Sequence, residues 1–188
     1  AAGTRLSMAN ESRATFLPHQ AVMHSHLDVL QLLLANGCSV ADRDSQGSTL
    51  LHAAAHYGRP EIARYLISTG ADVNATDFRR ATPLHVVGNA AAWSHFYGED
   101  VDEAMQRIIA TAKILLDAGA DVHARDATDD TPLHQAAYYK LAGVAELLLA
   151  RGADVNARNC RDETPLSEAE DPRSEYSRDH RSEPVVKL

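Results

Sequence analysis

The phrase Gly70-Ala71-Asp72-Val73-Asn74-Ala75 decides the fold, because it returns along the chain at regular distances. Two close copies are Gly119-Ala120-Asp121-Val122-His123-Ala124 and Gly152-Ala153-Asp154-Val155-Asn156-Ala157, and Gly37-Cys38-Ser39-Val40 is a degenerate one. From one glycine to the next, the first and last steps are equal and the middle step is longer. The equal steps give a period of about 33 residues, and a fixed period of this size indicates a stack of short structural repeats.

A second phrase confirms the period independently. Thr82-Pro83-Leu84-His85 returns as Thr131-Pro132-Leu133-His134, with variants that begin at Thr49 and Thr164. Its three steps are identical to those of the first phrase. The longer middle step predicts one insertion of about 16 residues, between His85 and Gly119, in an otherwise regular array.

The local chemistry of one unit predicts two helices joined by turns. Threonine caps a helix with its hydroxyl, and proline at the first helical position loses no hydrogen bond. Leu84, Val87 and Ala91 then share one face of a first helix, while Ile62 and Leu66 mark the apolar stripe of a second. The glycine of each first phrase follows that second helix, where a left-handed cap is needed.

These two phrases resemble those of the ankyrin repeat, over about residues 15–171. The resemblance implies an all-α solenoid of about five repeats, each a helix-turn-helix with a β-hairpin finger. It also implies a concave face, lined by inner helices and fingers, that binds another protein. Members are mostly scaffolds without catalytic residues, so we expect no enzyme activity and no cofactor.

The expected division of the chain has atypical outer repeats, because terminal repeats face water on one side. We expect an N-terminal extension at 1–14, repeats at about 15–45, 46–78, 79–127, 128–160 and 161–171, and a polar tail at 172–188.

The insertion, at about residues 91–106, distinguishes this chain from a regular stack. Residues 90–95 are predicted to continue the first helix of the third repeat, and residues 101–116 are spaced for one long amphipathic helix. The result is a protruding helical hairpin. Its tip carries Trp93, Phe96 and Tyr97, for which two interpretations stay open: binding a partner or packing against one another.

The fingers and the ends of the first helices supply the other candidate residues. Phe78 is notable because an aromatic ring at a turn has little core to join. Arg80 and Asp129 replace the usual turn glycine, which predicts strain. The full set of expected partner-binding residues is Tyr57, Phe78, Arg79, Trp93, Phe96, Tyr97, Arg125, Tyr138, Tyr139, Arg158 and Arg161. The resemblance further makes Asn74 and Asn156 candidates for hydroxylation by an oxygenase.

Chemical alternatives find little support in the residue pattern. His52, His85 and His134 belong to the repeat, where the family uses them for hydrogen bonds between neighbouring turns, whereas His19, His24, His26 and His56 are less regular. We expect no metal site, because the spacing of His24 and His26 matches no closed zinc site. The acidic residues at 99–103 precede a helix, where negative charge is favourable. The alternative function is an accessory part of an enzyme, whose insertion provides a ligand or metal site through His95, Glu99 and Asp100.

Net charge, apolar runs and cysteine content limit the class of partner and the cellular location. The net charge of −8 argues against a nucleic-acid surface, and no apolar run approaches the ~20 residues that cross a bilayer. Cys38 and Cys160 are expected to be free thiols in a reducing compartment. We therefore expect a cytoplasmic protein, with a nuclear or host-cell cytosol location as variants, that is a monomer by itself.

Overall fold

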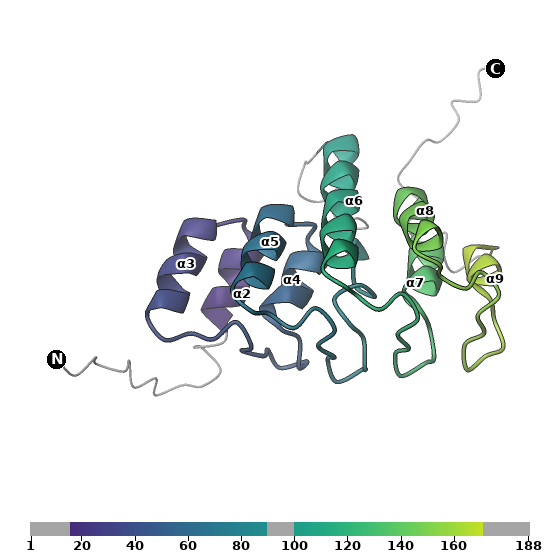
Figure 1. Ribbon diagram of the computed structural model, residues 1–188, viewed down its shortest axis with the longest axis horizontal. Helices are drawn as coiled ribbons and strands as arrows, with labels where there is room; N and C mark the ends of the chain where they lie inside the picture. The colour runs from purple at the N-terminus through teal and green to yellow at the C-terminus, as the bar shows by residue number, and fades with distance from the viewer. Residues whose placement is uncertain (1–15, 90–99, 171–188) are drawn as a thin grey trace, which may run out of the picture.

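The computed structural model describes residues 16–89 and 100–170, where the regular elements are all helices (Figure 1). Figure 1 shows them standing in a row from one end of the chain to the other, with loops projecting along one edge. The predicted all-α repeat solenoid is thereby confirmed. The helices are α2 (Phe16–Met23), α3 (Leu27–Ala35), α4 (Leu50–His56), α5 (Pro60–Ser68), α6 (Val101–Asp117), α7 (Pro132–Tyr138), α8 (Ala142–Ala150) and α9 (Pro165–Glu170).

Caps at both ends define each helix pair. Thr49 caps α4 in a capping box, in which its side chain and that of His52 each accept from the other's backbone N–H. Pro60 opens α5 at a position where no backbone hydrogen bond is lost. Gly70 closes the pair with φ +95°, and the N–H of Ala71 donates to the carbonyl of Leu66 (2.9 Å).

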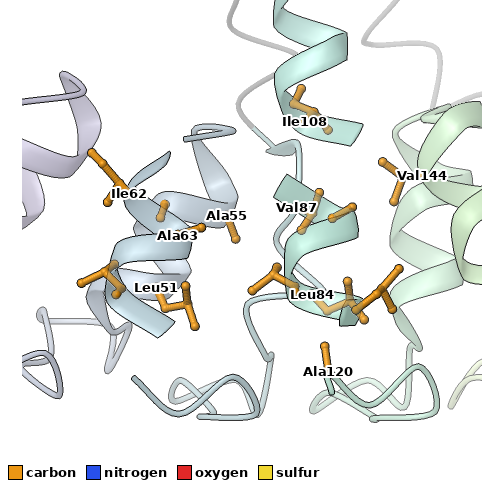
Figure 2. Close-up of a cluster of buried hydrophobic side chains, with 14 of the residues drawn as sticks. Leu51, Ala55, Ile62, Ala63, Leu84, Val87, Ile108, Ala120 and Val144 are labelled. Carbon is orange, nitrogen blue, oxygen red and sulfur yellow. The ribbon is translucent and has the colours of Figure 1, made fainter. Parts of the chain in front are cut away.

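One hydrophobic core runs along the stack, because each helix pair buries its apolar face against the next. Helix α5 contacts α6 and α6 contacts α8, while α2 contacts α4 and α7 contacts α9. Leu66, Leu115 and Leu148 are fully buried. Figure 2 shows Leu84 and Val87 of the third unit between side chains of the second and fourth units.

The insertion lengthens only one of the two helices of the third unit within the described residues. Helix α6 has 17 residues against nine in α5, as the sequence predicts, and the Asp100 carboxylate caps it by accepting from the N–H of Asp102 (2.8 Å). The predicted first helix of this unit is wrong over residues 83–88, which form successive turns, and Gly88 has φ +78°; its predicted continuation at residues 90–95 lies outside the described residues. Leu84 and Val87 are still buried, but Ala91 lies outside the described residues, as does the predicted hairpin tip.

Glycine suits position 88 because its backbone has a positive φ and because a side chain there would crowd the neighbouring residues. A Cβ atom on Gly88 would lie 2.7 Å from a methyl carbon of Leu141 and 2.9 Å from one of Ile108. The backbone therefore passes close to α6 and to Leu141, the N-cap residue of α8, and residues 83–88 form turns instead of an α-helix.

The fingers are hairpin loops that project from the helix pairs: finger 1 (residues 43–48), finger 2 (76–81), finger 3 (125–130) and finger 4 (158–163). Within the described residues the fingers form no β-strand. An isolated β-bridge joins Arg43 of finger 1 to Thr49. An aspartate or asparagine side chain holds each turn, as Asp77 does by accepting from the N–H groups of Arg79 (2.8 Å) and Ala81 (2.9 Å). These loops are too short for a ladder of backbone pairs.

Three of the fingers place a residue other than glycine in the left-handed region. Arg80 (φ +59°) and Asp129 (φ +58°) do so as the sequence predicts. Asp162 (φ +62°) does so as well, which was not predicted from the sequence. Only finger 1 uses glycine, at Gly47 (φ +78°).

Candidate protein-binding surface

A ladder of histidines fixes the row of fingers. In each case Nε2 donates to the backbone carbonyl of the residue just before the threonine (Thr49, Thr82, Thr131 or Thr164) that begins the next copy of the second phrase. The pairs are His19 with Ser48 (3.1 Å), His52 with Ala81 (3.0 Å), His85 with Asp130 (3.0 Å) and His134 with Glu163 (3.1 Å). The family role expected of the repeat histidines is thus observed. His19 shares it, contrary to its interpretation as irregular; its position one repeat length before His52 was the signal.

The same geometry keeps the buried rings neutral. Nδ1 of His85 accepts from the backbone N–H of Thr82 (3.1 Å), so the ring proton must be on Nε2. Burial lowers the pKa of His52 and of His85, and the carbonyl that accepts from each ring opposes that shift. His52 and His85 therefore connect their units as neutral rings.

Side chains of the finger stems add further links. Nη1 of Arg43 donates to Gly47 in its own finger and to Thr76 in the next, both at 2.6 Å. Arg125 repeats this arrangement with Asp129 (2.9 Å) and Arg158 (2.7 Å). The guanidinium of Arg125, an expected partner-binding residue, is therefore engaged within the stack.

Asn74 makes the corresponding link across the insertion. Its side-chain oxygen accepts from the N–H of Asp121 (2.9 Å), and its amide donates to the carbonyl of Gly119 (3.2 Å). Asn156 is also exposed, and its backbone N–H donates to Asp154 (2.9 Å). Of the two candidates for hydroxylation, Asn74 is the one whose amide connects neighbouring units.

The tip of finger 2 presents the most exposed aromatic ring of the described residues. Phe78 is 75% exposed, and its backbone N–H donates to the carbonyl of Gln46 in finger 1 (3.0 Å). Its ring lies on Gly47, where a Cβ atom would approach a ring carbon to 2.6 Å. Arg79 and Arg80 follow it, and both are exposed.

Tyrosines continue this surface onto the first helices. Tyr138 and Tyr139, at the end of α7, pack edge to face with ring centroids 5.0 Å apart. Burial and then the neighbouring Tyr138 raise the pKa of Tyr139, whereas the positive charge of Arg79 lowers it. Finger 2 and the end of α7 therefore lie within electrostatic range. Tyr57 is half-buried at the end of α4 and packs edge to face with His56, at 4.7 Å.

A polar cavity of about 270 Å³ lies where the fourth unit meets the last one. Its lining comprises Thr128, Asp130, His134, Gln135, Tyr138, Arg161 and Glu168. Tyr138 and Arg161 were expected at a binding surface, but the two buried carboxylates were not.

Asn159 and Arg161 join the carboxylates of this cavity. The amide of Asn159 donates to Asp130 (2.8 Å) and to Glu168 (3.1 Å), and Arg161 pairs with both Glu163 and Glu168. Burial raises the pKa of Glu168, and the hydrogen bond from Arg161 opposes that shift. Asn159 occupies the position of Asp77 in finger 2, and that exchange of acid for amide was the available signal.

The remaining expected residues divide into described and undescribed ones. Arg158 is exposed and pairs with the carboxylate of Asp162 (2.7 Å). Trp93, Phe96 and Tyr97 lie outside the described residues, as do His95 and Glu99. Cys38 and Cys160 are free thiols. Across residues 16–89 and 100–170, no group of three or more metal-binding side chains gathers, and no helix is both long and apolar enough to span a bilayer.

Comparison with known families agrees with this architecture on both sides of the insertion. Residues 5–87 match a family model described as ankyrin repeats (3 copies), and residues 115–169 match one described as ankyrin repeats (many copies). No curated protein matches the chain. Ankyrin repeats are generally protein–protein interaction modules and are typically non-catalytic. With its regular period, its helix pairs and its histidine ladder, this chain belongs to the ankyrin repeat family.

Proposed function

We propose that this chain is a non-catalytic module that binds a partner protein through its inner face, meaning the finger tips together with the first helices of the units. The observation that carries the proposal is the exposed ring of Phe78 on a rigid finger. The partner is another protein, and the chain by itself is a cytoplasmic monomer that binds neither nucleic acid nor membrane.

Phe78 has the properties of an interface anchor. Aromatic side chains are enriched at the centres of protein interfaces, and a few such residues carry most of the binding energy. Its ring rests on Gly47 and its backbone is bonded to finger 1, so little conformational freedom remains to be lost on binding. A ring that is 75% exposed still has most of its apolar surface available to a partner.

The tyrosines at the ends of the first helices and the arginines of the fingers extend the proposed surface to a size that suits a protein. Tyr57, Tyr138 and Tyr139 contribute ring edges from α4 and α7. Arg79 contributes charge, whereas Arg125, Arg158 and Arg161 contribute mainly by holding the fingers in place. Trp93, Phe96 and Tyr97 of the insertion belong to the same proposal as a second contact region.

Selection from a random peptide library, displayed on phage, tests the proposal even though the natural partner is unidentified. Fluorescence anisotropy then compares the selected peptides on the wild type and on Phe78→Ala. We expect Phe78→Ala to weaken binding about tenfold or more, as truncating an interface anchor does. Leu149→Ala is the matched control, because Leu149 is 45% exposed on α8, a second helix outside the proposed inner face, and its truncation should leave binding within about twofold.

Two results would contradict the proposal. One is a selection that yields no peptide binding to the folded chain. The other is a set of peptides that Leu149→Ala weakens as much as Phe78→Ala does. A variant with Trp93→Ala and Phe96→Ala tests the insertion separately, since it should weaken a selected partner while leaving the circular dichroism spectrum unchanged.

A further inference from the structure

The tip of finger 2 differs in charge from the other three tips. Its three residues, 78–80, carry one aromatic ring and two adjacent arginines, whereas the corresponding tip of finger 1 is uncharged. Finger 3 has an aspartate there, and in finger 4 Arg161 is followed by Asp162. Finger 2 is therefore the one tip of the four with a net positive charge.

The guanidinium groups of Arg79 and Arg80 have no carboxylate partner in the part of the chain that the structure describes. Both side chains are exposed, and neither makes a hydrogen bond or an ion pair there. The adjacent carboxylate of Asp77 accepts from the backbone N–H groups of Arg79 and Ala81 and so holds the turn. By contrast, the side chains of Arg43 and Arg125 are bonded to neighbouring fingers.

Two unpaired arginines in a chain of net charge −8 define the chemistry that would complement this tip. Arginine binds carboxylates with two parallel hydrogen bonds, and the ring of Phe78 offers apolar surface beside them. Nucleic acid fits less well, because its binding requires a broad basic surface that neutralises many phosphates. The neighbouring fingers 3 and 4 contribute carboxylates instead.

We propose that the tip of finger 2 docks an acidic segment of the partner protein, with carboxylates on Arg79 and Arg80 and an apolar side chain on Phe78. The proposal rests on the proposed function, since it names the partner chemistry of the same surface. The positive φ of Arg80 and the bond from Ala127 to the carbonyl of Arg79 (2.7 Å) fix the backbone from which both guanidiniums extend. The site is therefore organised before the partner arrives.

Three synthetic peptides of about 12 residues test this chemistry, because the glutamate and glutamine peptides match in side-chain size and differ in charge, and the lysine peptide reverses the charge. They share the same leucine, phenylalanine and glycine positions and carry glutamate, glutamine or lysine at the remaining ones. Fluorescence anisotropy on the full chain should show the glutamate peptide binding about tenfold more tightly than the glutamine peptide at low salt. Salt at about 0.5 M should remove most of that difference, because exposed charges are screened.

Variants identify the arginines as the cause. Arg79→Gln with Arg80→Gln should weaken the glutamate peptide about fivefold or more and leave the glutamine peptide within about twofold. The matched control, Arg64→Gln with Lys113→Gln, removes the same net charge from exposed positions on α5 and α6 and should change neither peptide beyond about twofold.

Three outcomes overturn the inference. They are equal binding of the glutamate and glutamine peptides, equal loss in the control variant, and tighter arginine-dependent binding of a short DNA duplex. Failure here is distinguishable from failure of the proposed function. If library-selected peptides depend on Phe78 but carry no carboxylates, the protein-binding function stands and the acidic preference is wrong.

Discussion

Replacing His85 by alanine should weaken the connection between the two halves of the stack and so destabilise the fold, because this ring connects the third unit to finger 3. Nε2 of His85 donates to the carbonyl of Asp130 (3.0 Å), and Nδ1 accepts from the N–H of Thr82 (3.1 Å). The ring is only 2% exposed. Its bond spans 45 residues, against 29 for the other three, so it joins units across the insertion.

The structure gives the size of the effect. The substitution leaves the buried N–H of Thr82 without its acceptor, at a cost of about 1–3 kcal/mol, and it removes one of the two hydrogen bonds to the carbonyl of Asp130, which still accepts from the N–H of Asp126 (3.0 Å). Loss of the packed ring adds a cavity term of a similar order. We therefore expect the free energy of unfolding to fall by about 3–5 kcal/mol in total.

Urea denaturation followed by far-ultraviolet circular dichroism measures this loss. With a slope of about 2 kcal/mol per molar urea, the midpoint should fall by about 1.5–2.5 M. His123→Ala is the matched control, since its side chain is exposed and only its backbone N–H is bonded, to Asp121. A loss below about 1 kcal/mol in His85→Ala, or an equal loss in the control, would refute the reasoning.

Two further predictions concern pH and backbone strain. Because burial lowers the pKa of His52 and His85 below the ordinary 6.5, the unfolded chain binds more protons than the folded chain between the folded pKa values and 6.5. The free energy of unfolding should therefore fall as the pH decreases below about 6.5, by up to about 1.4 kcal/mol per pH unit for each ring. Equal urea midpoints at pH values of about 7.5 and 5.5 would contradict this prediction. Arg80→Gly should raise the free energy of unfolding by about 0.5–1 kcal/mol. Glycine removes the steric strain of the left-handed conformation at φ +59°, and this gain exceeds the extra backbone entropy that glycine loses on folding. The same urea titration measures the gain, and an unchanged or lower midpoint is the opposing result.

The surface chemistry was partly predictable from the sequence. An aromatic residue and two arginines in a turn of fixed register indicate an exposed tip, because neighbouring repeats show which positions the core takes. Exposure of Phe78 followed from that register. The engagement of Arg125 with Arg158 did not, because it depends on the distance in space between two separate fingers.

The buried polar cluster at the last unit was less predictable from the sequence. Asn159 in place of an aspartate indicated a local difference, but its bonds to Asp130 and Glu168 join three segments of chain. Glu168 lies in a short terminal helix, where sequence alone favours exposure of a glutamate. Its burial comes from contact between α7 and α9.

The sequence by itself determined the period, the helix pairs outside the third unit and their caps, because each rests on contacts within one unit or between similar neighbours. Only the tertiary structure decided which side chains are hydrogen-bonded between fingers. It also decided that the third unit begins with turns and not with an α-helix. Residues 83–88 had the pattern of a helix, yet Gly88 passes within contact distance of Leu141 and Ile108 and takes a positive φ. Local periodicity indicates which face is apolar, whereas the path of the backbone there depends on how closely α6 and the residue before α8 approach it.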